Sequence, residues 1–401
     1  MIELQFNEND DVVIYDDVAN KLYHNQKLIP PTAVELSGSV DIRLYLGNAC
    51  NQNCEFCYEG SHKGCKDLNK EHINFPALAE KIKSVLGNRK IKQVSFWGGE
   101  PLLYWDSIKE YYPIVKEKWG FESCLISTNA TMLNKEITDF IINEGIFLGI
   151  SYDGPGQSLR HLNPFPKQKE NILRVLNNDR TKVSFNGVFS KYNDSVKGYI
   201  EHLTETLGTS EFNIGKINPI ILYGNRLNNN VRKYCLEEGQ LIQFYSDIYS
   251  GVCYGSLLQH YGYQYKQAIE MISKKLGIVD YACPPLGNYL FFDLEGNILQ
   301  YDKHMTNNMI DGRLLGEGNI FNITAIEEVP TLIMPETIKK IHNYCNECNM
   351  KFFCNGGVFY DTENEENQRY NCRNSYLYTL MKFYLYVSDL VKAGIKCSSM
   401  Y

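Results

Sequence analysis

Two alternating sequence patterns in the middle of the chain limit its fold more than any other feature. Short apolar runs predict six β-strands: Ile42–Leu46, Gln93–Phe96, Cys124–Ser127, Phe147–Tyr152, Val183–Val188 and Phe212–Ile217. Amphipathic stretches between them predict helices: Pro76–Leu86, Ser107–Lys118, Lys135–Asn143, Pro166–Leu176 and Val196–Leu207. Strands that alternate with helices form parallel βαβ units, so we expect an α/β barrel or open sheet with its chemistry at the carboxyl ends of the strands.

The rest of the chain divides around this core, which spans residues 41–225. Residues 1–40 alternate apolar and polar residues in places and predict a β-appendage. Residues 226–280 predict a helical connector. Residues 281–401 are richer in Gly, Asn and Cys and predict a second, metal-dependent domain with a helix at about Ser375–Val391.

Composition narrows the class of protein. The chain has 401 residues, of which 44% are apolar, so it can bury a large core. Its 40 basic and 47 acidic residues give a net charge of −7, which gives no electrostatic reason to expect a nucleic-acid partner. The first residues are acidic rather than basic and apolar, and no apolar run is long enough for a bilayer. We therefore predict a cytoplasmic protein with reduced cysteines.

Three cysteines lie within a stretch of eight residues that follows the first predicted strand. Cys50, Cys54 and Cys57 have C-x3-C-x2-C spacing, which places three thiols on one tight loop. Three thiolates can bind three irons of a [4Fe–4S] cluster and leave the fourth iron open for another ligand. Zinc ligation is the alternative, since thiolate loops also bind zinc.

A second segment with unusual backbone freedom follows the next predicted strand. In it, Gly98 and Gly99 let the backbone approach a ligand closely, and Pro101 fixes the exit direction. Glu100 and nearby carbonyls can accept hydrogen bonds from an ammonium group, although a plain β-turn also explains this run.

Together the two segments resemble the radical SAM superfamily, including the aromatic residues Phe56 and Tyr58 on either side of the third cysteine. The resemblance implies a partial (β/α)6 barrel. It also implies that the open iron binds the amino and carboxyl groups of S-adenosylmethionine, whose reductive cleavage gives a 5′-deoxyadenosyl radical. The glycine segment then corresponds to the motif that holds the methionine amino group.

Two further strand ends match segments of the same family. Ser127-Thr-Asn129 resembles its Thr-Asn-Gly segment, with Ala130 in place of glycine, and the segment from Ser151 through Asp153 resembles its Ser-x-Asp-Gly-Pro. The resemblance implies contacts with the ribose hydroxyls and the methionine carboxylate. We expect Arg160 to bind that carboxylate. Phe56 and Ile221 are candidate adenine contacts, with ordinary core packing as the alternative.

A second set of cysteines lies near the C-terminal end of the sequence. Cys345, Cys348 and Cys354 have C-x2-C-x5-C spacing, and the more distant Cys372 completes a set of four. Four thiolates can fill a [4Fe–4S] cluster or a zinc site. The spacing resembles the auxiliary-cluster domain called SPASM, which occurs in enzymes that modify peptides and proteins.

The resemblance to the SPASM pattern is incomplete. Tyr301 and Val358 stand where that family has cysteines, which leaves Cys283 without its expected companions. We therefore predict one auxiliary [4Fe–4S] cluster and the loss of a second. Asp302 aligns with a proton acceptor of the anaerobic sulfatase-maturating enzymes. It is also interpretable as a turn residue, or, like Tyr301, as a replacement cluster ligand.

These resemblances predict a peptide or protein substrate and a reaction that crosslinks, oxidises or epimerises a ribosomally made precursor. The expected partners are an electron donor such as flavodoxin or ferredoxin and a separate peptide-recognition protein, unless a sheet edge adds the peptide as a strand. The alternatives are a sulfatase-type formylglycine-generating maturase, an enzyme with a small-molecule substrate, and a non-enzymatic, metal-stabilised binding module.

Overall fold

The computed structural model describes residues 2–5, 12–30, 39–57, 74–222, 230–253, 257–276, 289–299, 318–325, 347–354 and 365–391. Its centre is an eight-stranded sheet of order β10-β9-β8-β7-β6-β5-β11-β12. The first six strands of this sheet, in chain order, are β5 (Ser39–Tyr45), β6 (Lys90–Trp97), β7 (Ser123–Thr128), β8 (Phe147–Ser151), β9 (Val183–Phe189) and β10 (Asn213–Pro219). They pair in parallel, which confirms the predicted α/β class.

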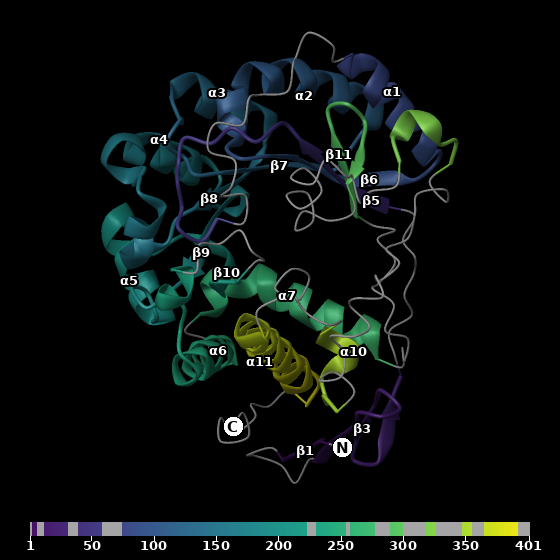
Figure 1. Cartoon of the computed structure of the whole chain (residues 1–401), viewed down its shortest axis with the longest axis vertical. Helices are drawn as coiled ribbons and strands as arrows, with labels where there is room; N and C mark the ends of the chain where they lie inside the picture. Colours follow the sequence, from purple (N-terminus) through teal and green to yellow (C-terminus); the bar gives the residue numbers. More distant parts are fainter. Residues whose placement is uncertain are drawn as a thin grey trace.

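Helices cover one face of this sheet. They are α1 (Phe75–Leu86), α2 (Trp105–Trp119), α3 (Lys135–Glu144), α4 (Phe165–Asn178) and α5 (Val196–Leu207), and Figure 1 shows them along the outer side of the curved sheet. Alternate strand residues such as Ile42, Val94 and Ile126 face these helices and are fully buried. The side chains of Asn74, Asn134 and Ser195 cap the starts of α1, α3 and α5.

A seventh parallel strand enters the sheet from the segment predicted as the second domain. Strand β11 (Tyr289–Asp293) pairs with β5 and forms a hairpin with β12 (Ile298–Leu299). The sheet therefore extends past the predicted boundary at residue 225. The pairing of β11 with β5 joins residues far apart in sequence, and the local patterns carry no information about it.

Three long helices cover the remaining side of the structure. They are α6 (Glu238–Cys253), α7 (Leu258–Lys275) and α11 (Glu365–Val391), and α10 (Lys351–Cys354) lies beside α11 in Figure 1. Helix α11 begins ten residues earlier than the sequence predicts. Within the described part of the chain, no helix combines the length and hydropathy that a membrane span requires.

The N-terminal segment forms a separate antiparallel sheet of four strands, β1 (Ile2–Gln5), β2 (Val12–Asp16), β3 (Lys21–His24) and β4 (Lys27–Ile29). Its apolar face packs against the C-terminal helices, where the ring of Tyr15 lies 5.3 Å from that of Phe353 and 5.1 Å from that of Phe383. The Asn20 amide donates to the carbonyl of Lys275. The predicted β-appendage is thus attached to α7, α10 and α11.

Candidate cofactor and cluster site

The three-cysteine loop leaves the carboxyl end of β5 and is fastened to three neighbouring segments. The Leu46 amide continues the strand by donating to the carbonyl of Trp97, 2.8 Å away. The hydroxyl of Tyr104 accepts from the Ala49 amide at 2.8 Å, and the Glu55 amide donates to the Leu159 carbonyl at 2.9 Å. These bonds fix the loop at the predicted edge of the sheet.

The thiols of this loop are suited to bind a cluster. Cys50 is exposed, whereas Cys54 and Cys57 are half-buried. Burial raises the pKa of Cys54 to about 11, partly offset by the nearby Arg160 guanidinium. Among the described residues, no three Cys, His, Asp or Glu side chains converge on one point as ligands of a single ion do. Three thiols on one loop are the donor set that a [4Fe–4S] cluster with one open iron requires, so the residues present fit such a cluster.

The raised pKa predicts slow alkylation of Cys54 in metal-free protein. With a pKa of about 11, about one Cys54 thiol in a thousand is ionised at pH 8, and only the thiolate reacts. Iodoacetamide labelling followed by peptide mass spectrometry should therefore show Cys50 modified well before Cys54. The Cys54 rate should rise about a hundredfold between pH 8 and pH 10. Equal rates for the two thiols at pH 8 would contradict this prediction.

The glycine pair after β6 lies directly against the cysteine loop. A Cβ on Gly98, whose φ is +154°, would lie 2.6 Å from the carbonyl oxygen of Gly47. A Cβ on Gly99 would lie 2.4 Å from that of Ala49. Backbone hydrogen bonds also join the two loops. The Gly99 amide donates to the Gly47 carbonyl, and the Glu100 amide donates to the Ala49 carbonyl. The glycines therefore permit close contact between two loops of the protein itself.

Glu100 has a different role from the predicted ammonium acceptor. Its side chain is 1% exposed and caps the short 3-10 helix η2 (Pro101–Tyr104), accepting from the Leu102 amide. The same carboxylate accepts from the Thr128 hydroxyl at 2.6 Å and the Asn129 amide at 2.7 Å. Burial raises its pKa, while these hydrogen bonds lower it in part. The carboxylate thus joins the loops after β6 and β7, and ammonium binding remains a prediction for the backbone carbonyls.

Replacing Glu100 with glutamine should destabilise the fold. The glutamine side chain directs N–H groups at a donor whose hydrogen bond the wild-type carboxylate accepts. A buried donor that loses its acceptor costs about 1–3 kcal/mol. Chemical denaturation of Glu100→Gln compared with wild type measures this change. The control is Glu117→Gln, an equivalent change at an exposed position on α2. Equal stability of both variants would show that the Glu100 carboxylate does not hold the loops together.

The segment after β7 binds the cysteine loop through its asparagine. The side-chain amide of Asn129 donates to Asn51 Oδ1 at 2.9 Å, and the side-chain amide of Asn51 donates to the Thr131 hydroxyl. Ala130, fully buried, has a φ of 63°, in the left-handed region that favours glycine. The backbone here thus has the conformation that suits the glycine of the related Thr-Asn-Gly segment.

A buried ion pair lies at the end of the fourth strand. The Arg160 guanidinium donates to both carboxylate oxygens of Asp153, at 2.7 and 2.9 Å, and lies 5.1 Å from the centre of the Phe56 ring. The Val188 amide also donates to Asp153. Arg160 therefore lies beside the cysteine loop, where the carboxylate-clamp prediction requires it, with two of its nitrogens bound to Asp153. Asp153 orients this guanidinium, and a contact between Asp153 and the cofactor stays a prediction.

The inner face of the sheet contains polar residues that sequence reasoning did not identify. Asn186 on β9 lies across its neighbours, and Cβ atoms on Gly149 and Gly215 would come within 3.0 and 2.2 Å of its side-chain amide. Ser127 on β7 and Ser151 on β8, both predicted contacts, are half-buried, and Ser127 Oγ lies above Gly149. The signal available in the sequence was the alternation of polar and apolar residues along β9.

Two buried polar atoms on the same inner face have no hydrogen-bond partner within the described part of the chain. They are Asp41 Oδ1 on β5 and Trp97 Nε1 on β6. Trp97 pairs with Tyr45 and Asp41 with Gln93, so the two are separated along the strands by roughly 13 Å. Buried polar groups are nearly always hydrogen-bonded, which makes these atoms candidates for ligand contacts.

The C-terminal cysteines gather beside the N-terminal sheet. Cys348 precedes α10, Cys354 ends it, and Cys372 lies on α11. Burial, together with the charges of Cys348 and Cys372, raises the pKa of Cys354 to about 11. Five predicted residues lie outside the described residues: Tyr58, Cys283, Tyr301, Asp302 and Cys345.

Residues 44–194, which include the three-cysteine loop and most of the parallel strands, match the model of the Radical SAM superfamily. The chain therefore contains a radical SAM domain, whose family implies a [4Fe–4S] cluster and S-adenosylmethionine.

Among curated proteins, the chain is similar to radical SAM cyclopropyl synthase TigE of Paramaledivibacter caminithermalis, with 25% identity over 324 residues, which cover 72% of this chain and 68% of that protein. It is 31% identical over 117 residues to the serine-type anaerobic sulfatase-maturating enzyme of Bacteroides thetaiotaomicron, which covers 27% of this chain and 28% of the relative.

Two solved structures share the fold. The structure of native anSMEcpe with bound AdoMet has a TM-score of 0.62 and 17% identity, and covers 88% of this chain and 98% of its own. Streptococcus suis SuiB bound to precursor peptide SuiA has a TM-score of 0.54 and 15% identity, and covers 80% and 72%.

Proposed function

We propose that this chain is a radical SAM enzyme that modifies a peptide or protein. The observation that carries the proposal is the joining of three strand-end segments to one loop of three cysteines. Backbone bonds fasten the Gly98 segment to the cysteine loop, and Glu100 ties it to the segment after β7. Leu159 and Arg160 connect the segment after β8 to the same loop. Such preorganisation is what a large, reactive cofactor requires.

Each proposed role belongs to a residue at this edge of the sheet. Cys50, Cys54 and Cys57 would hold a [4Fe–4S] cluster, which with S-adenosylmethionine supplies the one-electron chemistry that yields a 5′-deoxyadenosyl radical. The carbonyls of Gly98 and Gly99 would accept from the methionine ammonium, and Arg160 would bind its carboxylate. The remaining proposed contacts are with ribose, from Ser127, Asn129 and Ser151, and with adenine, from Phe56 and Ile221.

The names of the similar proteins support a peptide or protein substrate. They include a sulfatase-maturating enzyme, and one related structure is described with a precursor peptide.

The C-terminal cysteines would complete the enzyme. Cys345, Cys348, Cys354 and Cys372 would hold one auxiliary [4Fe–4S] cluster, with zinc as the alternative. A flavodoxin or ferredoxin would supply the electrons. The second candidate reaction is formylglycine formation, because the chain is similar to a sulfatase-maturating enzyme. Asp302 would be the proton acceptor in that reaction.

The test is anaerobic incubation of the reconstituted protein with S-adenosylmethionine, reductant and the short peptide encoded beside the gene. Loss of two hydrogens from the peptide indicates oxidation or crosslinking, whereas uptake of one deuterium from deuterium oxide indicates epimerisation. A sulfatase-derived peptide serves as the alternative substrate for formylglycine formation. A protein that contains zinc without sulfide, or that never cleaves S-adenosylmethionine, would refute the proposal.

A further inference from the structure

Helix α11 holds the end of the sixth strand through one fully buried side chain. The Leu222 amide donates to Asn371 Oδ1 at 3.0 Å, and Asn371 Nδ2 donates to the Leu222 carbonyl at 2.5 Å. Asn371 is 1% exposed and Leu222 is 3% exposed, so water does not compete for these bonds. The asparagine thus satisfies both backbone groups of one residue, as a neighbouring strand would.

This contact lies between the two proposed cofactor regions. Leu222 follows Ile221, the proposed adenine contact, and the Ile220 amide continues the ladder of β10 by donating to the Phe189 carbonyl. Asn371 precedes Cys372, a proposed ligand of the auxiliary cluster. Two adjacent residues of α11 therefore belong to different proposed sites: Asn371 contacts the barrel, and Cys372 belongs to the C-terminal cysteines.

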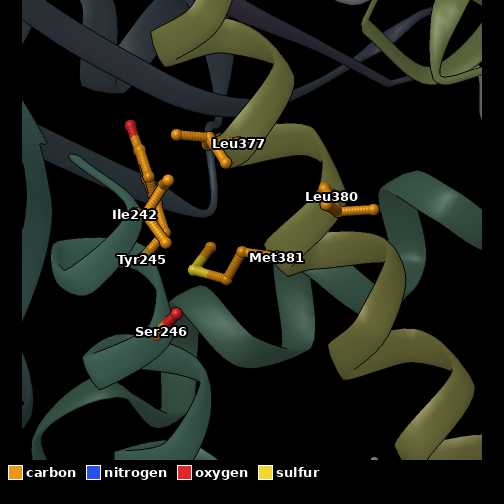
Figure 2. Close-up of a pocket in the computed structure, with 6 residues that line it drawn as sticks. All are labelled: Ile242, Tyr245, Ser246, Leu377, Leu380 and Met381. Carbon is orange, nitrogen blue, oxygen red and sulfur yellow. The ribbon is translucent and has the colours of Figure 1, made fainter. Parts of the chain in front are cut away.

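The rest of α11 is fixed against α6 and α7. Tyr245 donates to Asn374 Oδ1 at 2.6 Å, the hydroxyls of Tyr249 and Ser388 are 2.8 Å apart, and Tyr265 donates to Asp389. Figure 2 shows a small pocket between α6 and α11. Its lining residues are Ile242, Tyr245, Ser246, Leu377, Leu380 and Met381. A helix held this firmly can transmit its position to the loop that it binds.

We propose that Asn371 is a positioning residue for the adenosyl half of S-adenosylmethionine. It holds residues 220–222 so that Ile221 faces the adenine. This role rests on the proposed function, because it requires that the pocket binds an adenosyl ligand.

The test compares two leucine substitutions on the same helix in anaerobically reconstituted protein. Asn371→Leu keeps the branched shape of the side chain, with a larger volume, and removes both bonds to Leu222. Asn374→Leu removes another buried asparagine, whose partner is Tyr245 and not the loop. The measurements are the dissociation constants of S-adenosylmethionine, 5′-deoxyadenosine and methionine, together with iron content and hydrogen exchange of a peptide that contains Leu222. Asn371→Ser is the milder variant if the leucine variant does not fold.

We expect Asn371→Leu to weaken both adenosyl ligands about tenfold, equal to about 1.4 kcal/mol, with methionine affinity and iron content unchanged. The Leu222 amide should exchange faster, and Asn374→Leu should change each affinity less than about twofold. Unchanged adenosyl affinity in Asn371→Leu, or equal losses in both variants, would overturn the role of Asn371.

If wild-type protein bound neither adenosyl ligand, the proposed function would fail, and the role of Asn371 with it.

Discussion

Replacing Cys50, Cys54 and Cys57 together with alanine should lower the iron content from about eight to about four per chain and abolish cleavage of S-adenosylmethionine. The three thiols are the proposed ligands of the cofactor-binding cluster, and no other described cysteine lies on that loop. Iron and sulfide analysis measures the first effect, and formation of 5′-deoxyadenosine under reductant measures the second.

A matched control removes three cysteines from elsewhere in the chain. Alanine at Cys124, Cys235 and Cys253, which belong to neither proposed ligand set, should leave the iron content and cleavage unchanged. If the first variant kept all its iron, the loop would not be a cluster site.

Replacing Asp153 with alanine should destabilise the protein by about 3–5 kcal/mol, because it leaves the Arg160 guanidinium buried without its partner. The side chains of Arg160 and Asp153 are 11% and 1% exposed, so solvent cannot replace the lost carboxylate. Chemical denaturation of wild type and variant gives the change in the free energy of unfolding.

The double variant Asp153→Leu with Arg160→Met separates the ion pair from its packing. It removes both charges, keeps most of the volume, and should recover a large part of the stability lost in Asp153→Ala. A double variant no more stable than Asp153→Ala would mean that the carboxylate acts mainly through the Val188 amide, to which it is also bonded.

The cofactor loops were predictable from sequence because each follows its strand directly. A cysteine, glycine or serine at the carboxyl end of a parallel strand lies at the shared edge whatever the rest of the fold does, and Cys50, Gly98 and Ser151 are such residues. The alternation of strands and helices fixed the class of the sheet for the same local reason.

Contacts between distant segments were not predictable in this way. The carboxylate of Glu100 bonds to Thr128 at the end of the next strand and to Asn129 after it, whereas the sequence around Glu100 indicated an ammonium contact or a turn. The side chain of Asn186 can lie across its neighbours only because glycines occupy the facing positions on two different strands. The insertion of β11 beside β5 and the contact of Asn371 with Leu222 join residues that no local pattern relates.

The packing of Tyr15 against Phe353 and Phe383 has a consequence for synthesis of the chain. The ribosome adds about 5–20 residues per second, so roughly 20 to 70 seconds separate Tyr15 from Phe383. During this time the apolar face of the β1–β4 sheet lacks the surface that covers it in the finished fold. We expect chaperones to bind the nascent β1–β4 segment until α10 and α11 have been synthesised.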